Sequence, residues 1–318
     1  MTNNAHNERR HDLSREGFLK AAGVLGATGV VSAAIAAVAP EAAHASGRPT
    51  TDGRYIEVEA GVRVFAQDWG TGKPIVFVHG LPLSYLNWEY QIAQLAPMGY
   101  RCIGIDLRGF GQSDKPYGTY SFDVFADDLK TVLDTLNVQG ATLVGHSMGS
   151  GVALNYAARH GQHISKLMLA GAATPCLTKR PDFPQGAPRA VFDKQLLGLS
   201  NDRPAALAAF SSAFFYKKVS PQFQAWFTSL GQAASPYAHA ECLKLLRDAD
   251  QRPLMSTVSV PTLIVHGVHD LIAPFSITGA VLAKGIPGAR LDTFAESGHG
   301  LFIDEKDRFN STLVTFVS

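Results

Sequence analysis

Short apolar segments alternate with segments of helical periodicity from about residue 54 to the end of the chain. The first two, residues 55–58 and 62–69, flank Ala60-Gly61 and predict an opening hairpin. The later ones are continuous apolar runs, which are expected of strands that are covered on both faces. They comprise residues 74–79, 100–106, 141–145, 164–170, 262–266 and 289–294.

The intervals between these strands carry helical patterns. After Ser121, apolar residues recur at helical spacing up to Leu136, and acidic residues gather near the start, where the helix dipole favours negative charge. Further helices are predicted at residues 86–96, 148–160, 277–284 and 302–316. The alternation predicts an α/β fold, with a mostly parallel central sheet and helices on both faces.

Residues 174–255 interrupt this alternation. The interval opens with Pro175, Pro181, Pro184 and Pro188 and continues with helical segments that are rich in aromatic residues. We predict an inserted helical cap, flanked by core segments at 54–173 and 256–318. Most of its aromatic side chains are expected to form the cap's own core, and a few to line a pocket beneath it.

The N-terminal residues follow the order of an export signal. A polar stretch with basic residues precedes an Ala/Gly/Val-rich run at 21–39, and Ala43-His44-Ala45 resembles a cleavage site. Residues 14–20 resemble a twin-arginine signal, with Glu16 in place of the second arginine. We predict an export signal at 1–45, a linker at 46–53 and a periplasmic or secreted protein. If it were retained, the leader would act as a membrane anchor.

Charge and cysteine content narrow the range of functions. The formal net charge of the 318 residues is +1, which gives no electrostatic reason to expect nucleic acid or an anionic membrane as partner.

The three cysteines form no C-x-x-C pair, so no zinc or thioredoxin-like site is indicated. Cys102 lies in an apolar run and is predicted to be buried. A Cys176–Cys242 disulfide would suit an oxidising compartment, and the sequence leaves that pairing open.

The strongest chemical signal surrounds Ser147. The segment Gly145-His146-Ser147-Met148-Gly149 matches G-x-S-x-G, with a predicted strand before it and a predicted helix after it. A serine on such a sharp turn has a strained backbone, and side chains at the flanking glycine positions would collide with adjacent elements. The motif therefore predicts an exposed nucleophilic hydroxyl on Ser147.

A serine hydroxyl is a weak nucleophile that needs a base, and the base needs an orienting acid. Asp270 follows the strand at 262–266, and His299 follows the strand at 289–294. Both lie beyond carboxyl ends of strands, where the chemistry of parallel sheets gathers. The earlier position for an acid, after residues 164–170, holds no carboxylate. We therefore predict a catalytic triad of Ser147, Asp270 and His299.

Other titratable side chains are predicted to have other roles. His269 is adjacent to Asp270 and is expected to point elsewhere, and Glu296 is expected to be a solvated loop carboxylate. Structural or packing contacts are expected of four more histidines, namely His79, His146, His160 and His163.

An acyl-transfer site also needs two backbone N–H donors for the oxyanion. Met148 follows the nucleophile and is predicted to supply one. Leu81, on the loop after residues 74–79, is predicted to supply the other. Gly80 allows that loop to approach closely, while Pro82 has no N–H and stiffens the loop.

Several segments taken together point to a family. They are GHSMG at 145–149, HGLPL at 79–83, DLRGFGQS at 106–113, FADDL at 125–129, TP at 174–175 and PDFPQG at 181–186. From about Val62 to the C-terminus, the chain resembles the cofactor-free bacterial haloperoxidases, or perhydrolases, and related aryl esterases of the α/β-hydrolase superfamily.

The resemblance implies an α/β-hydrolase fold and hydrolysis of carboxylic esters through an acyl-enzyme. It also implies a side reaction in which hydrogen peroxide replaces water, and the peracid formed oxidises halide without metal or haem, so that no cofactor is expected. The family's triad and oxyanion donors fall on Ser147, Asp270, His299, Leu81 and Met148. Pro82 matches a proline of members that favour perhydrolysis, whereas Leu81 stands where an aromatic residue is usual.

Two other functions stay open at this stage. A lactonase or a carbon–carbon bond hydrolase can use the same triad, and a non-catalytic ligand receptor can share the fold, because fold does not fix function. The predicted partners are a small-molecule ester and hydrogen peroxide, without nucleic acid or stable membrane insertion after processing. The sequence leaves the oligomeric state open.

Overall fold

The computed structural model describes residues 53–318, and their central feature is an eight-stranded sheet in the order β1-β2-β4-β3-β5-β6-β7-β8. The export signal at 1–45 and all but the last residue of the linker lie outside the described residues. The strands are β1 (Arg54–Glu59), β2 (Val62–Trp69), β3 (Lys73–Val78), β4 (Tyr100–Asp106), β5 (Ala141–His146), β6 (Ile164–Ala170), β7 (Thr262–Gly267) and β8 (Arg290–Phe294).

Strands β3 to β8 pair in parallel, while β1 and β2 form the antiparallel hairpin at one edge and β2 pairs antiparallel with β4. The sheet is therefore mostly parallel, which confirms the fold predicted from the alternating segments. Within the described residues, no helix is long and apolar enough to cross a membrane.

The helices are α1 (Glu89–Leu95), α2 (Phe122–Thr135), α3 (Met148–Arg159), α4 (Arg189–Phe214), α5 (Pro221–Gln232), α6 (Pro236–Asp248), α7 (Gly279–Gly285), α8 (Leu301–Asp304) and α9 (Lys306–Val317). Ser121 precedes α2 and caps its N-terminus, because its hydroxyl accepts a hydrogen bond from Val124 N at 3.1 Å.

Successive residues of β3 face two separate apolar cores. Val76 and Val78 pack in the core that contains residues of α2, α3 and α7, whereas Ile75 and Phe77 pack in the core that contains residues of α1 and α9. This alternation explains the continuous apolar runs of the central strands, since helices cover both faces of the sheet.

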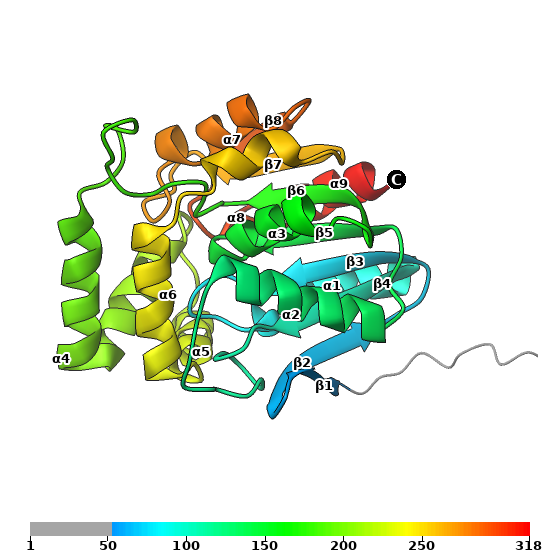
Figure 1. Ribbon diagram of the computed structural model, residues 1–318, viewed down its shortest axis with the longest axis horizontal. Coiled ribbons are helices and arrows are strands. Elements are labelled where there is room, and N and C mark those ends of the chain that lie inside the picture. Colours follow the sequence, from blue (N-terminus) through cyan, green and yellow to red (C-terminus); the bar gives the residue numbers. More distant parts are fainter. Residues whose placement is uncertain (1–52) are drawn as a thin grey trace, which may run out of the picture. The chain divides into compact units, whose positions relative to one another are not determined.

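Three helices, α4 to α6, fill most of the interval that interrupts the alternation. They lie at the end of the sheet to which the arrows of the parallel strands point (Figure 1). Helix α4 has a kink at Asp202, where the backbone leaves helical geometry, and Asp202 Oδ1 accepts a hydrogen bond from Ala205 N at 3.0 Å. The cap therefore stands over the carboxyl ends of the strands.

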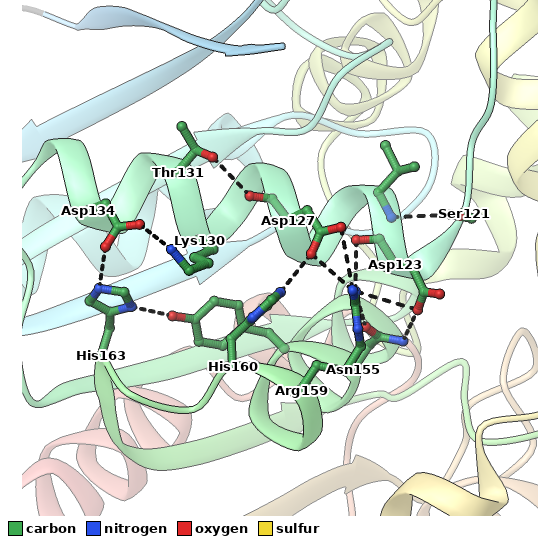
Figure 2. Close-up of polar contacts among 12 residues, drawn as sticks. Ser121, Asp123, Asp127, Lys130, Thr131, Asp134, Asn155, Arg159, His160 and His163 are labelled. Carbon is green, nitrogen blue, oxygen red and sulfur yellow. Dashed lines mark hydrogen bonds and ion pairs between the residues drawn. The ribbon is translucent and has the colours of Figure 1, made fainter.

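Polar contacts hold α2 against α3, the helix that follows Ser147 (Figure 2). His160 Nε2 lies 2.7 Å from Asp127 Oδ1, and His163 Nε2 lies 2.9 Å from Asp134 Oδ1. The buried Tyr156 hydroxyl lies 2.6 Å from the other ring nitrogen of His163. Both histidines make structural contacts, as the sequence predicts.

One expectation differs from the structure, and one pairing that the sequence left open is decided by it. The single helix expected at 302–316 is divided into α8 and α9, because Glu305 has non-helical backbone angles. The Cys176–Cys242 disulfide is not formed, since all three cysteines are free and buried. Cys176 Sγ instead accepts a hydrogen bond from Arg180 Nε at 3.3 Å, and Cys102 is buried as predicted.

Candidate active site

Ser147 occupies the sharp turn between β5 and α3. Its φ of 54° and ψ of −121° place a non-glycine residue in the left-handed region, where side chains are rarely found. Its backbone N–H donates to Ala170 O at 3.0 Å, which ties the turn to the end of the neighbouring strand β6. Ser147 is 5% exposed and therefore buried, which differs from the exposed hydroxyl that the motif predicts.

Glycines surround this turn because the backbones approach too closely for a side chain. A Cβ on Gly145 would lie 2.3 Å from Gly149 O, and one on Gly149 would lie 2.5 Å from His79 O. A Cβ on Gly80 would lie 2.8 Å from Ser147 Cβ. The loop after β3 is therefore in direct contact with the serine turn, as the sequence predicts.

Asp270 and His299 form a buried pair. His299 Nδ1 donates to Asp270 Oδ2 at 2.7 Å, and neither side chain is exposed to solvent. The other carboxylate oxygen, Oδ1, accepts hydrogen bonds from Ile272 N at 2.9 Å and Ala273 N at 2.8 Å. These two amides fix the carboxylate plane, which in turn fixes the orientation of the imidazole.

The surroundings of Asp270 favour its ionised form. Burial raises the pKa of Asp270, but the positive charge of His299 and hydrogen bonds from His266 and His299 outweigh burial and hold this pKa well below its usual range. Asp270 is therefore ionised at neutral pH. His299 Nε2 is buried and has no hydrogen-bond partner in residues 53–318, which leaves it available to accept a proton.

His266 is a residue of this site that the sequence analysis did not single out. It lies near the end of β7, and its Nε2 is 2.9 Å from Ala273 O and 3.4 Å from Asp270 Oδ2. Its only signal in the sequence is its position near the end of β7, four residues before Asp270. It lies near Oδ2, whereas the two backbone amides bind Oδ1.

The loop after β3 carries Leu81 into this region. Leu83 N donates to Gly80 O at 2.8 Å, which closes a turn around Leu81 and Pro82, and the peptide between these two residues is cis. Met148 is the first residue of α3, so its N–H belongs to the unpaired donors of a helix N-terminus. Both predicted oxyanion donors thus border the Ser147 turn.

Most of the described chain matches one known protein family. A model of the alpha/beta hydrolase fold matches residues 73–306 of the chain. The chain belongs to the alpha/beta hydrolase fold family. The hydrolase is 44% identical over 265 residues to AB hydrolase superfamily protein YisY of Bacillus subtilis (strain 168), covering 83% of this chain and 98% of that protein.

Two further relatives have names that state an activity. The hydrolase is 34% identical over 266 residues to non-heme chloroperoxidase CPO-A1 of Kitasatospora aureofaciens, covering 81% of this chain and 97% of that protein. Its fold matches an esterase from Exiguobacterium antarcticum with a TM-score of 0.81 and 39% identity, covering 84% and 99% of the two chains. These matches confirm the predicted resemblance to haloperoxidases and esterases.

His79 joins two loops of the hydrolase. Its Nδ1 donates to Gly80 O at 2.9 Å, and its Nε2 accepts from Leu107 N at 3.0 Å. Burial lowers the pKa of His79 to about 4, so the ring is neutral, as this pattern of one donor and one acceptor requires. The side chain fixes the turn at Gly80, as predicted.

The remaining titratable residues of these loops are directed elsewhere. His146 Nε2 donates to His299 O at 3.1 Å, and burial lowers the pKa of His146 well below its usual value. The His269 ring stacks on Tyr216 with centroids 3.8 Å apart, and Glu296 is exposed to solvent. Neither His269 nor Glu296 is part of the buried pair.

Aromatic side chains from the cap contact the buried pair. Phe214, at the end of α4, lies edge-on to the His299 ring with centroids 5.0 Å apart, and it packs on Phe227 of α5 at 4.5 Å. Both phenylalanines are buried.

Within residues 53–318, no cluster of His, Cys, Asp and Glu side chains could hold a metal ion.

Proposed function

We propose that this hydrolase cleaves carboxylic esters through an acyl-enzyme on Ser147, with Asp270 and His299 completing the catalytic triad. The observation that carries the proposal is the buried 2.7 Å contact between Asp270 and His299, which leaves His299 Nε2 without a partner in the described chain. The strained Ser147 turn borders the same region, and relatives named esterase and chloroperoxidase support this class of reaction.

In the first step, Ser147 Oγ attacks the acyl carbonyl while His299 Nε2 accepts the hydroxyl proton. Asp270 keeps the proton on His299 Nδ1 and stabilises the imidazolium that forms. The N–H groups of Leu81 and Met148 donate hydrogen bonds to the oxyanion. These hydrogen bonds stabilise the charge strongly because the site is buried away from bulk water. Collapse of the intermediate passes the proton from His299 to the leaving alcohol.

In the second step, water or hydrogen peroxide releases the acyl group. His299 accepts a proton from the incoming molecule, whose oxygen attacks the acyl carbonyl, and Ser147 regains its proton when the bond to its oxygen breaks. Water yields a carboxylic acid and peroxide yields a peracid. The peracid can transfer an oxygen atom to halide and become the carboxylic acid, which would account for haloperoxidase activity without a metal.

The proposal is tested with a substrate panel of short aliphatic and aromatic p-nitrophenyl esters, lactones and vinylogous 1,5-diketones. We expect ester turnover by the wild type and loss of turnover in Ser147→Ala. Preference for a lactone or for carbon–carbon cleavage would assign the same triad to a different substrate. Binding of these compounds without any turnover would contradict catalysis and favour a receptor.

Perhydrolysis is tested separately, by adding hydrogen peroxide and bromide to the ester assay. We expect peracid formation and bromination of a phenol dye that both disappear in Ser147→Ala. If bromination persisted in that variant, it would not depend on an acyl-enzyme, and this part of the proposal would be wrong.

A further inference from the structure

A short segment of the cap runs across the loop that carries His299. It comprises residues 214–217, which we call the strap, and it leads out of the C-terminus of α4. Gly300 N donates to Phe214 O at 2.9 Å, so the strap is hydrogen-bonded to the residue after His299. The Phe214 ring is fully buried and lies edge-on against the imidazole of His299.

One buried carboxylate joins the strap to the residue before His299. Asp304, the last residue of α8, accepts hydrogen bonds from Tyr216 N at 3.0 Å and from Lys217 N at 3.0 Å. The same side chain accepts from Gly298 N at 2.8 Å. The strap and Gly298, which lie far apart in the sequence, thus share one acceptor.

This carboxylate is held at an energetic cost. Burial raises the pKa of Asp304, and the hydrogen bonds from Tyr216, Gly298 and Lys217 lower it only in part. A side chain that served only to fill space could be apolar at no such cost. The three amides therefore indicate a specific link rather than general packing.

The strap and the loop are too close for side chains to separate them. A Cβ on Gly298 would lie 2.9 Å from Tyr216 N, and one on Gly300 would lie 2.6 Å from the Phe215 ring. The strap also reaches the acid loop, since the Tyr216 ring stacks on His269, the neighbour of Asp270. Movement of the strap would therefore displace both loops of the Asp270–His299 pair.

We propose that Asp304 is a positioning residue, which couples the cap to the catalytic base through Tyr216, Lys217 and Gly298. The inference rests on the proposed function for its kinetic consequence, because His299 acts as the base in both steps. With the link intact, the Phe214 ring of the cap and the His299 imidazole keep one position relative to each other. With the link broken, the strap and the His299 loop keep the hydrogen bond from Gly300 N to Phe214 O but lose the shared carboxylate, so both segments move more freely.

The test compares Asp304→Asn with Glu305→Gln. Asparagine has the same shape but no charge and one oxygen. Even if that oxygen keeps the Oδ2 contacts with Tyr216 N and Gly298 N, its NH₂ group faces Lys217 N, so the link loses one hydrogen bond and the charge that strengthens the other two. Glu305 is a matched control, because its Oε2 accepts from Glu296 N at 3.0 Å and from Ser297 Oγ at 2.7 Å. It binds the same loop but does not contact the strap through any hydrogen bond in the described chain.

Hydrogen exchange measures the link without reference to activity. In Asp304→Asn, peptides covering residues 210–220 and 295–303 should both exchange at least roughly tenfold faster, whereas Glu305→Gln should affect only the second. In the wild type, the amides of Tyr216, Lys217 and Gly298 should open with the same free energy. That wild-type measurement stands even if the variant does not fold, and clearly different opening free energies would overturn the inference.

Ester kinetics measure the positioning role. At temperatures where all variants are folded, Asp304→Asn should lower kcat by roughly 10- to 100-fold with little change in KM, and Glu305→Gln should lower it much less. An unchanged kcat in Asp304→Asn, or equal losses in the two variants, would contradict positioning through the cap. If the wild type itself hydrolysed no ester, the proposed function would fail, while the exchange data would still decide whether the link exists.

Discussion

His299 Nδ1 donates to Asp270 Oδ2 at 2.7 Å in a setting where neither side chain is exposed to solvent. This relationship predicts the effect of Asp270→Asn. The amide would favour the wrong imidazole tautomer, so kcat for ester hydrolysis should fall by roughly 10⁴-fold while the fold is kept. Steady-state kinetics with a p-nitrophenyl ester provide the measurement, and a loss smaller than about tenfold would show that Asp270 does not orient the base.

The contact between Gly80 and the serine turn predicts a steric effect. An added Cβ would lie 2.8 Å from both His146 Nδ1 and Ser147 Cβ, so Gly80→Ala must displace Ser147, His146 or the Leu81 loop. We expect kcat/KM to fall by roughly 100-fold or more. Gly118→Ala is the matched control, because nothing lies within 4 Å of its added Cβ and wild-type activity should remain. Similar losses in both variants would contradict this explanation.

A buried ion pair predicts a large effect on stability. Arg108 Nε and Nη2 each donate to Asp128 at 2.6 Å, and both side chains are 6% exposed. Asp128→Asn would leave the guanidinium with Glu59 as its charged partner, a largely exposed carboxylate 2.8 Å from Arg108 Nη1, which should lower the free energy of unfolding by up to about 3–5 kcal/mol. Urea denaturation measures this change.

Glu241→Gln is its control, since Glu241 forms a surface pair with Lys244 at 2.7 Å. Exposed pairs contribute about 0–1 kcal/mol, so the control should unfold almost as the wild type does. If the two variants lost the same stability, burial would not determine the strength of these ion pairs.

Asp106 predicts a pH dependence of stability. Burial raises its pKa to about 6, in spite of hydrogen bonds from Gln112 N and Tyr85 N. An unfolded aspartate has a pKa of about 3.9, so the folded state binds an extra proton between these values. The contribution of Asp106 to stability is therefore complete below about pH 4 and is lost as the pH rises through about 6.

Asp106→Asn removes this titration. The free energy of unfolding of the wild type, minus that of the variant, should fall by up to about 1.4 kcal/mol per pH unit between pH 4 and pH 6. Above pH 6 this difference should stay constant. Denaturant unfolding at a series of pH values measures it. A constant difference over the whole range would show that Asp106 titrates alike in the folded and unfolded states.

Local signals explain why so much of the fold could be predicted from the sequence. Each central strand is one continuous apolar run, because helices cover both faces of the sheet, and the G-x-S-x-G motif contains the whole Ser147 turn. The Asp270–His299 contact could be predicted because both residues follow strand ends on one edge of the sheet.

The features that sequence analysis missed depend on contacts between distant segments. The break at Glu305 follows Asp304, whose carboxylate binds amides of the strap and of the His299 loop, and no local pattern encodes these partners. The support of Asp270 by His266 was missed because a strand histidine has no local signature of such a contact. The export signal at 1–45, the cap boundaries and the periplasmic or secreted location stay predictions from the sequence.

The most direct test of an acyl-enzyme on Ser147 is mass spectrometry of the protein quenched during turnover of p-nitrophenyl acetate, with and without hydrogen peroxide. We predict one acetyl group on the peptide that contains Ser147, cleared faster when peroxide is present, and no adduct in Ser147→Ala. Ester turnover without this adduct, or an acetyl group on another residue that is required for turnover, would contradict the proposed mechanism.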